Sequence, residues 1–213
     1  MLIKFNKVLP HPIKELNYKA SEIWDKEAEF DSKNTYLVKA PSGTGKTTFL
    51  SIIYGIRRDY DGIVTLDGKD VIKLKPSEVK HLRRSQFSIV FQGLKLFPEL
   101  SAFENIEIKN KISNHYSKKE IFEFAERLGV VSLMERKSDI LSFGQRQRLA
   151  VIRSLCQPFD FLLLDEPFSH LDMENAKLCL DLIFEECQKR GSGFILTTLG
   201  ADYGAKYDKV IGL

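Results

Sequence analysis

The sequence lacks a long hydrophobic segment. Its longest uninterrupted apolar runs have four residues, at 149–152 and 161–164, whereas a helix that crosses a bilayer needs roughly 20. The opening residues MLIKFNK also lack the apolar stretch and the small-residue cleavage site of a secretory signal. We therefore expect neither a membrane-spanning helix nor a secretory leader.

Cysteine, proline and glycine are also infrequent, and the net charge is small. The 213 residues include 3 Cys, 7 Pro and 13 Gly, and 32 Lys and Arg against 29 Asp and Glu leave a net charge of +3. With 43% hydrophobic residues, this composition excludes disordered, collagen-like and low-complexity proteins. The cysteines show no CxxC spacing, and the small net charge gives no bulk attraction to nucleic acid or acidic lipid. We expect a soluble, reduced, cytosolic chain whose length suits one domain, 1–213.

Short apolar runs alternate with longer amphipathic segments along the chain. The apolar runs predict strands at 36–38, 63–66, 89–91, 161–164 and 194–196, and an edge strand at 210–213. Asp-Gly pairs at 61–62 and 67–68 predict tight turns on both sides of the second strand. Alternation of this kind is typical of the βαβ units of an α/β protein.

Three helix starts have the capping-box spacing, in which a Ser precedes a Glu or Gln by three positions. They are Ser101 with Glu104, Ser117 with Glu120, and Ser142 with Gln145. Residues from about 93 to 158 are therefore expected to form a mainly helical subdomain inserted into the α/β chain.

The most specific local pattern is APSGTGKTT at 40–48, between a predicted strand and a predicted helix. It fits a P-loop, with Ala40 at the usually glycine first position. Glycines let backbone N–H groups surround phosphate oxygens, and the next helix directs its positive end at them. We expect Lys46 to reach the β- and γ-phosphates and the Thr47 hydroxyl to bind Mg²⁺; a surface turn is the alternative. The candidate nucleotide-binding residues here are Ser42, Gly43, Thr44, Gly45, Lys46, Thr47 and Thr48.

Two further patterns become informative beside a P-loop. The run FLLLDE at 161–166 is an apolar strand ending in two carboxylates. Asp165 would hold the metal and Glu166 would polarise an attacking water. Ser142 begins a capped helix, and a helix start of this kind can bind an anion. Taken alone, the two acids are an ordinary strand end and Ser142 is an ordinary cap.

In order and spacing, these motifs resemble those of the ATP-binding subunits of ATP-binding cassette (ABC) transporters. The matching stretches are Walker A at 40–48, the Q-loop at 90–92, the signature LSFGQ at 141–145, Walker B at 161–166 and the D-loop SHLD at 169–172. The resemblance covers nearly the whole chain, and the stretch 82–106 is most similar to the lipoprotein-release and macrolide-export branch. It implies an α/β P-loop NTPase fold whose helical subdomain is inserted between the Q-loop and the signature.

The resemblance also implies roles for the matching residues. The catalytic residues would be Lys46, Gln92 and Glu166, with Glu166 as the general base, and the Mg²⁺ ligands would be Thr47, Gln92 and Asp165. Gln92 would also sense the γ-phosphate. The signature residues Ser142, Gly144 and Gln145 would bind ATP held by the opposite subunit of a dimer. Phe143 stands where the signature usually has its first glycine.

Two positions are less clear. The family stacks an aromatic side chain on adenine well before the Walker lysine, where Tyr18 is the candidate and His11 its rival. After the strand at 194–196, Thr198 matches the usual threonine, and Leu199 stands where a histidine normally follows. In the family that histidine bonds the γ-phosphate, so its absence predicts slow hydrolysis.

The implied function is an ATPase subunit that binds ATP and Mg²⁺, closes as a homodimer or heterodimer, and powers transmembrane permease subunits from the cytoplasmic face of the membrane. The alternatives are a nucleotide-binding module with little intrinsic hydrolysis and a soluble, non-transport ABC ATPase. The apolar segment 96–103 is the candidate permease contact. No nucleic-acid partner is expected, since Lys80, Arg83 and Arg84 are interpreted as a solvated helix face.

Overall fold

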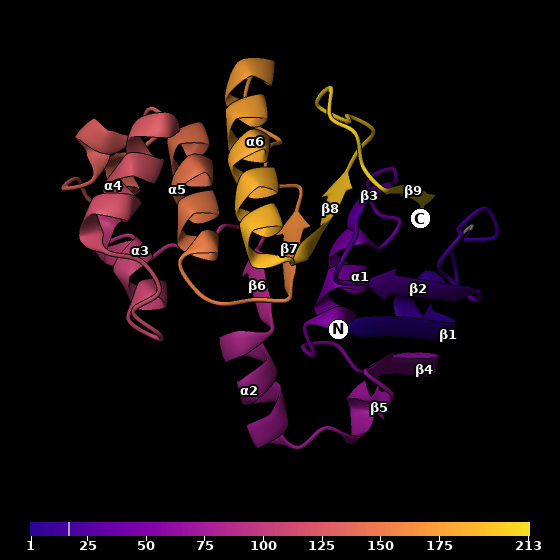
Figure 1. The fold of residues 1–213 in the computed structure, drawn as a ribbon. Coiled ribbons are helices and arrows are strands. Elements are labelled where there is room, and N and C mark those ends of the chain that lie inside the picture. The colour runs from indigo at the N-terminus through magenta and orange to yellow at the C-terminus, as the bar shows by residue number, and fades with distance from the viewer. Residues whose placement is uncertain (17) are drawn as a thin grey trace.

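A computed structural model describes residues 1–16 and 18–213. A parallel sheet lies at the centre, with β1, β2 and β4 on one side and helices α3 to α6 on the other (Figure 1). No helix of the described chain is both long and apolar enough to cross a membrane. The three cysteines are buried and unpaired.

The parallel sheet has the strand order β6-β7-β8-β3-β9. Its strands are β3 (Thr35–Lys39), β6 (Phe87–Val90), β7 (Phe161–Asp165), β8 (Gly193–Thr198) and β9 (Lys209–Gly212). Side chains alternate between the faces of a strand, and Phe161 and Leu163 of β7 join one hydrophobic cluster while Leu162 and Leu164 join the other. Because both faces are covered, the core strands are mainly apolar, and the sequence predicts them correctly.

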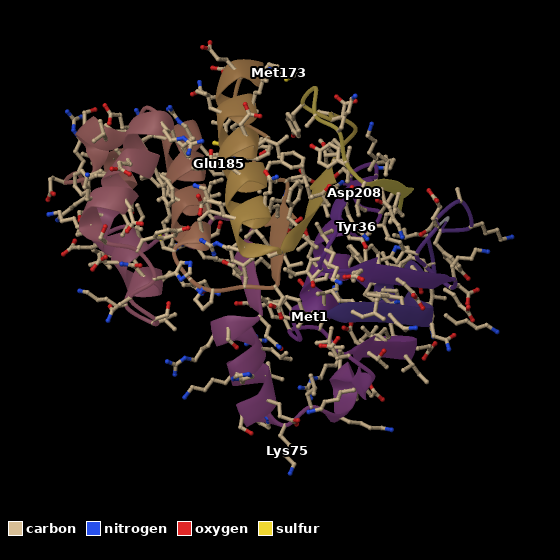
Figure 2. The ribbon with its side chains drawn as sticks, in the orientation of Figure 1. Met1, Tyr36, Lys75, Met173, Glu185 and Asp208 are labelled. Atoms are coloured by element: carbon tan, nitrogen blue, oxygen red, sulfur yellow. The ribbon has the colours of Figure 1, made fainter. Side chains whose placement is uncertain are left out.

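The edge strand β9 is held by the start of β3. The Asp208 carboxylate accepts hydrogen bonds from the backbone N and the hydroxyl of Thr35, both at 2.8 Å. Figure 2 shows Asp208 near Tyr36 at this side of the sheet. The expected strand at 210–213 is therefore confirmed, displaced by one residue.

A smaller antiparallel sheet, ordered β2-β1-β4-β5, was largely missed by the sequence analysis. It consists of β1 (Leu2–Pro10), β2 (Glu27–Asp31), β4 (Tyr60–Leu66) and β5 (Lys69–Asp70). In β1 the buried Ile3 and Phe5 alternate with exposed Lys4 and Asn6. Polar residues interrupt β1 and β2, so of this sheet the apolar runs predict only the part of β4 at 63–66.

The predicted turn at 61–62 is wrong. Asp61 and Gly62 lie inside β4, opposite a register shift in β1 between Asn6 and Leu9. Gly62 has φ +88°, and a Cβ there would lie 2.3 Å from the Lys7 carbonyl oxygen. The Asp-Gly pair therefore marks a β-bulge contact and not a turn.

The described residues form six α-helices. They are α1 (Lys46–Ile53), α2 (Pro76–Ser85), α3 (Ala102–Asn110), α4 (Lys118–Arg127), α5 (Phe143–Leu155) and α6 (Met173–Arg190). All three predicted capping boxes are present, at the starts of α3, α4 and α5. On α2, Lys80 and Arg84 are exposed as expected. Arg83 is instead half-buried, because its guanidinium lies over the Tyr54 ring and donates to the carbonyls of Tyr54 and Gly55 at 3.1 and 3.2 Å.

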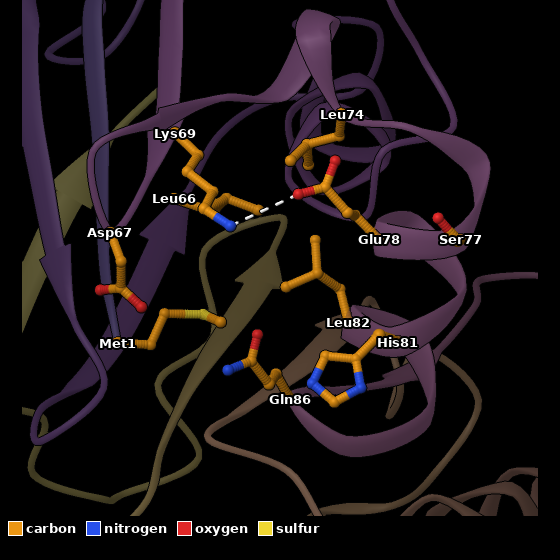
Figure 3. Close-up of a pocket in the computed structure, with 10 residues that line it drawn as sticks. All are labelled: Met1, Leu66, Asp67, Lys69, Leu74, Ser77, Glu78, His81, Leu82 and Gln86. Atoms are coloured by element: carbon orange, nitrogen blue, oxygen red, sulfur yellow. Dashed lines mark hydrogen bonds and ion pairs between the residues drawn. The ribbon is translucent and has the colours of Figure 1, made fainter.

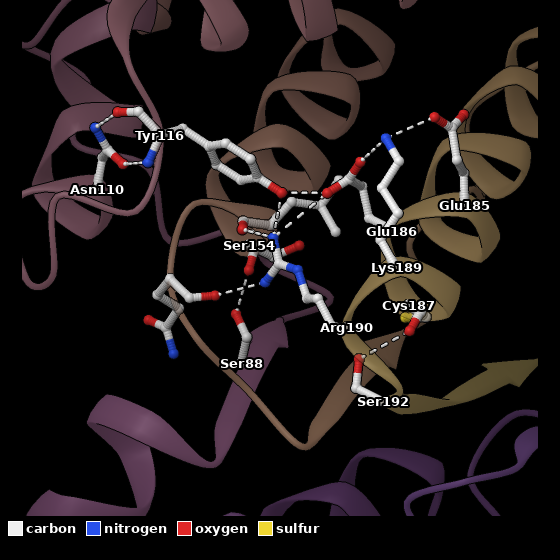
Figure 4. A network of polar contacts seen from close by, with 12 residues as sticks. Ser88, Asn110, Tyr116, Ser154, Glu185, Glu186, Cys187, Lys189, Arg190 and Ser192 are labelled. Carbon is white, nitrogen blue, oxygen red and sulfur yellow. Dashed lines mark hydrogen bonds and ion pairs between the residues drawn. The ribbon is translucent and has the colours of Figure 1, made fainter.

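A buried polar network fastens the start of α4 to the end of α6 (Figure 4). The Tyr116 hydroxyl contacts the Glu186 carboxylate and accepts a hydrogen bond from Arg190 at 2.6 Å. Arg190 also donates to the carbonyls of Leu155 and Gln157, at 2.7 and 2.8 Å. Burial, followed by the hydrogen bond to Glu186, raises the pKa of Tyr116 to about 12, so the phenol stays protonated. The network joins the helices between β6 and β7 to the main body of the protein.

Candidate functional site

The loop 40–45 leads from β3 to the start of α1, at the carboxyl end of the sheet. Gly43 and Gly45 have φ values of +81° and +105°, which side chains other than glycine rarely adopt. A Cβ on Gly45 would also approach Ile13 and Trp24, at 3.0 and 3.2 Å. The buried Trp24 donates its indole N–H to the Thr44 carbonyl at 3.1 Å, and this hydrogen bond supports the loop from the protein interior. No motif singled out Trp24; it is the only tryptophan of the chain.

Lys46, the first residue of α1, is at the centre of the site. Its side chain is only 4% exposed, and its Nζ donates to the carbonyl oxygens of Ala40 and Pro41 at 2.9 and 2.8 Å. The same Nζ lies 3.2 Å from Oε1 of Glu166. The site thus brings together the predicted phosphate-binding lysine and the predicted general base as an ion pair.

Oxygen donors converge beside this pair. The Thr47 hydroxyl lies 3.5 Å from Oε1 of Gln92. Burial raises the pKa of the Asp165 carboxyl group, and hydrogen bonds with the side chains of Thr47 and Thr197 oppose that rise. The three side chains proposed as metal ligands therefore approach one another at the ends of β6 and β7. Within the described residues no group of three His, Cys, Asp or Glu side chains could hold a metal ion, so a cation here would depend on the hydroxyl and the amide as well.

Thr197 supports both acids and was missed by the sequence analysis. Its hydroxyl lies 3.2 Å from Oδ1 of Asp165, and it accepts a hydrogen bond from the backbone N of Glu166 at 3.3 Å. It belongs to β8, the neighbour of β7 in the sheet. Only the pairing of the two strands shows this contact. Glu166 itself has φ +47°, an uncommon backbone conformation for a residue with a side chain, and this is typical of functional sites.

A cavity of about 210 Å³ borders the loop on the side of Tyr18. Tyr18, Trp24, Pro41 and Thr44 are among its lining residues. The rival residue, His11, faces away: its ring nitrogen Nε2 lies 3.4 Å from Asp61. Of the two candidates for adenine stacking, the geometry favours Tyr18.

The signature residues lie at the start of α5, whereas Lys46 lies at the start of α1. Ser142 and Gln145 form the capping box of this helix. A Cβ on Gly144 would lie 3.2 Å from the carbonyl oxygen of His170, so the D-loop packs closely against this position. In the single chain, therefore, Gly144 contacts the segment after Walker B and not the P-loop.

A second cavity beside Glu166, of about 430 Å³, is bordered by the loop that follows β8. Thr198, Leu199 and Tyr203 line it together with Glu166. Leu199 is 60% exposed, and the sequence has no histidine after residue 170. This loop accordingly presents a leucine where the sequence comparison expected a histidine.

The segment 96–103 is partly core and partly surface. Phe97 is 51% exposed, whereas Phe103 packs on Phe122 of α4 with ring centroids 5.6 Å apart. The preceding Leu94 is buried, and Arg153 donates to its carbonyl oxygen and to that of Lys95. The apolar surface available here is therefore centred on Phe97.

Another cavity, of about 400 Å³, lies apart from this site between α2 and the β4–β5 turn (Figure 3). Leu66, Leu74 and Leu82 provide apolar walls, and Lys69 pairs with Glu78 at 3.4 Å on its rim. Its lining includes none of the P-loop or Walker B residues, so it plays no part in the site built around Lys46.

Comparison with known proteins agrees with these motifs. The family model described as "ABC transporter" matches residues 27–169. The uncharacterized ABC transporter ATP-binding protein YvrO of Bacillus subtilis (strain 168) is 33% identical over 177 residues, which cover 82% of this chain and 77% of that protein. The lipoprotein-releasing system ATP-binding protein LolD of Buchnera aphidicola subsp. Schizaphis graminum is 30% identical over 164 residues, covering 76% and 72%.

A longer relative and a solved structure extend the comparison. The molybdate/tungstate import ATP-binding protein WtpC of Pyrococcus horikoshii is 36% identical over 154 residues, which are 70% of this chain but only 43% of WtpC. The dimeric structure of MJ0796, described as a bacterial ABC transporter cassette, superposes with a TM-score of 0.84 at 24% identity, covering 100% of this chain and 94% of MJ0796. This likeness establishes the fold.

Proposed function

Since the chain belongs to the ABC transporter family, we propose that it binds and hydrolyses ATP and thereby powers a separate membrane permease. The observation that carries the proposal is the meeting of Lys46, Asp165 and Glu166 at the carboxyl ends of β3 and β7. A lysine, a metal-binding carboxylate and a base within one small region are the groups that phosphoryl transfer to water requires.

The loop fits the phosphates of ATP. No atom lies within 4 Å of the position where Gly43 would carry a Cβ, and the free N–H groups at the start of α1 can bind an anion. Lys46 is paired with the Glu166 carboxylate and donates hydrogen bonds to two carbonyl oxygens. Phosphate oxygens would compete for the same amine, so ATP binding would release the Glu166 carboxylate from Lys46. Tyr18 would stack on the adenine in the adjacent cavity.

The donor set also fits Mg²⁺, which prefers hard oxygen ligands and bridges phosphate groups. Thr47 supplies a hydroxyl, Gln92 an amide oxygen and Asp165 a carboxylate. When bound, the ion would neutralise charge that develops on the phosphate oxygens. Thr197 would keep the Asp165 carboxylate oriented toward the ion.

The reaction is ATP plus water to ADP plus phosphate. The water oxygen forms a bond to the γ-phosphorus, and the bond from that phosphorus to the bridging oxygen of ADP breaks. The Glu166 carboxylate, freed from Lys46, accepts the proton of the water. Lys46 offsets the negative charge of the phosphates in a nearly dry site.

Two copies of the subunit, or this chain and a related one, would complete the sites. Ser142 and Gln145 cap α5, and both are at least partly exposed, as is Gly144; there the three residues would bind ATP held by the other subunit. The permease would dock on the surface around Phe97 and hold the protein at the cytoplasmic face of the membrane. Relatives are named for lipoprotein release and for molybdate or tungstate import, so the shared function is ATP-driven work, and we assign cargo selection to the permease.

A second candidate function, a nucleotide-binding module that closes on ATP but hydrolyses it slowly, is favoured by Leu199. This leucine borders the cavity beside Glu166 and offers no hydrogen-bond donor from its side chain. Steady-state turnover with the permease separates this candidate from a fast ATPase. Co-purification with a membrane protein separates both from a soluble, non-transport ATPase.

The test of the proposal is calorimetric titration of the protein with ATP and Mg²⁺, using Lys46→Ala and the exposed Lys33→Ala as a matched pair. Loss of Lys46 should weaken ATP binding about 100-fold, because a charge-assisted contact to phosphate contributes up to about 3 kcal/mol. Lys33→Ala should bind like the wild type. Equal affinity in all three proteins would overturn the proposal.

A further inference from the structure

The cavity beside Glu166 has few polar side chains that are free to act in it. Leu199, Gly200 and Ala201 offer no side-chain donor. Ser169 is already engaged, since its hydroxyl lies 2.9 Å from Nδ1 of His170 and accepts from Gln147 at 3.2 Å. Apart from Thr198, the remaining lining residue with a hydroxyl is Tyr203.

Tyr203 is held in this cavity by packing. Its ring meets Phe168 edge-on, with centroids 5.1 Å apart and an interplanar angle of 89°. Phe168 is buried and follows Glu166 by two positions, so the aromatic contact ties the two segments together. Tyr203 has φ +56°, and the turn around it is fixed by Gly204, whose N–H donates to Asp202 at 3.0 Å.

The phenol is a hydrogen-bond donor at neutral pH. Burial raises the pKa of Tyr203, the nearby Thr198 side chain lowers it, and the Glu166 carboxylate adds to the rise. Thr198 and Glu166 line the same cavity as the phenol. A protonated phenol beside a carboxylate can donate a hydrogen bond but does not compete for the proton that the carboxylate takes up.

We propose that Tyr203 supplies the hydrogen bond that the loop after β8 directs at the terminal phosphate of ATP and at the attacking water beside Glu166. The inference rests on the proposed ATP hydrolysis and adds to it a residue that determines the rate. Tyr203 thus provides, from four positions further along the loop, the donor that Leu199 lacks. Thr198 lines the cavity beside Tyr203, and Phe168 packs against the Tyr203 ring.

The experiment compares Tyr203→Phe with Tyr207→Phe. Both variants lose one hydroxyl from the same loop, but the Tyr207 hydroxyl donates to the Asp202 carbonyl at 3.1 Å and does not line the cavity. We expect Tyr203→Phe to lower kcat roughly 10- to 100-fold with little change in KM, since loss of one preorganised donor costs up to about 100- to 1000-fold. Tyr207→Phe should keep the wild-type kcat.

A binding measurement gives a readout that does not depend on turnover. The purified chain is titrated with Mg²⁺ and ADP, and separately with Mg²⁺, ADP and aluminium fluoride, which mimics the phosphoryl group in transfer. Tyr203→Phe should bind ADP as the wild type does and bind ADP with aluminium fluoride roughly tenfold more weakly or worse. Adding Leu199→His to Tyr203→Phe should restore at least part of that affinity, because the new imidazole faces the same cavity.

The outcomes distinguish failure of the proposed ATPase function from failure of the proposed role of Tyr203. Wild-type protein that does not bind ATP contradicts the proposed function itself. Wild-type binding with unchanged kcat and aluminium fluoride affinity in Tyr203→Phe overturns the role of Tyr203 alone. Equal losses in Tyr203→Phe and Tyr207→Phe, with a lowered melting temperature, would assign the effect to folding of the loop and would also overturn it.

Discussion

At the scale of single residues, the site contains charges that neutralise one another. Lys46 and Glu166 are paired at 3.2 Å with both side chains largely buried. Removing one partner of a buried pair leaves an uncompensated charge, which destabilises a protein strongly. Each member of the pair therefore keeps the other from becoming an uncompensated buried charge in the nucleotide-free protein, and both supply groups to the reaction.

This pair leads to a prediction for Glu166→Gln. The amide cannot accept the proton of water, so a dimer closed around ATP should persist long after the wild type has reopened. Without nucleotide, the variant should melt at a lower temperature than the wild type, because Lys46 loses its counter-charge. ATP should stabilise the variant more than the wild type.

Size exclusion with ATP and Mg²⁺, together with melting curves, tests this prediction. Exposed Glu174→Gln on α6 serves as the control. A Glu166→Gln protein that stays monomeric at every ATP and protein concentration, also in the presence of its permease, would contradict the prediction.

At the scale of elements, two glycines with similar backbone angles have different reasons to be glycine. Gly62 and Gly68 have φ values of +88° and +81°. A Cβ on Gly62 would overlap the Lys7 carbonyl, whereas one on Gly68 would meet no atom within 4 Å. Gly68 needs only the backbone conformation, while Gly62 also needs the space against β1.

Gly62→Ala should therefore lower the free energy of unfolding by roughly 2–5 kcal/mol, the sum of backbone strain and overpacking. Gly68→Ala should lower it by roughly 1–2 kcal/mol, from backbone strain alone. Urea denaturation followed by circular dichroism measures both values. Equal losses would mean that β1 moves aside and that the contact between Gly62 and Lys7 imposes no constraint.

The strands and helices show which parts of the fold can be predicted from sequence patterns and which cannot. The strands of the parallel sheet were predictable because both faces are buried, and the starts of α3, α4 and α5 were predictable because capping is local. Most of the antiparallel sheet was missed because polar residues interrupt its strands, and the turn at Asp61 was wrong because a bulge uses the same residue pair. Trp24, Thr197 and Tyr203 could not be predicted, since each acts across strands or loops distant in the sequence.

At the scale of the whole molecule, the exposed Phe97 tests the proposed permease contact. Phe97→Glu should leave the fold intact, because the side chain is 51% exposed, and should weaken assembly with the permease at least about tenfold, as loss of an aromatic anchor does. Ile63→Glu, a substitution of a similarly exposed residue on the antiparallel sheet, should assemble normally. Pull-down of purified subunits measures the difference.

The outcome is decisive in either direction. Insoluble Phe97→Glu protein would place this side chain in the core and contradict the assignment of the surface. Normal assembly of Phe97→Glu would also contradict it, whereas loss of assembly in both variants would indicate a general effect of added charge.

The network at the end of α6 has a mechanical consequence. This helix begins at Met173, which borders the cavity beside Glu166, and its 18 residues extend roughly 27 Å. At the other end of α6, Glu186 and Arg190 contact the Tyr116 hydroxyl. Tyr116 lies just before α4, and Phe103 packs on Phe122 of that helix. Because α6 joins the edge of this cavity to the contacts around Tyr116, we expect a change in the shape of the cavity to shift the start of α4 together with the helix, and with it Phe103.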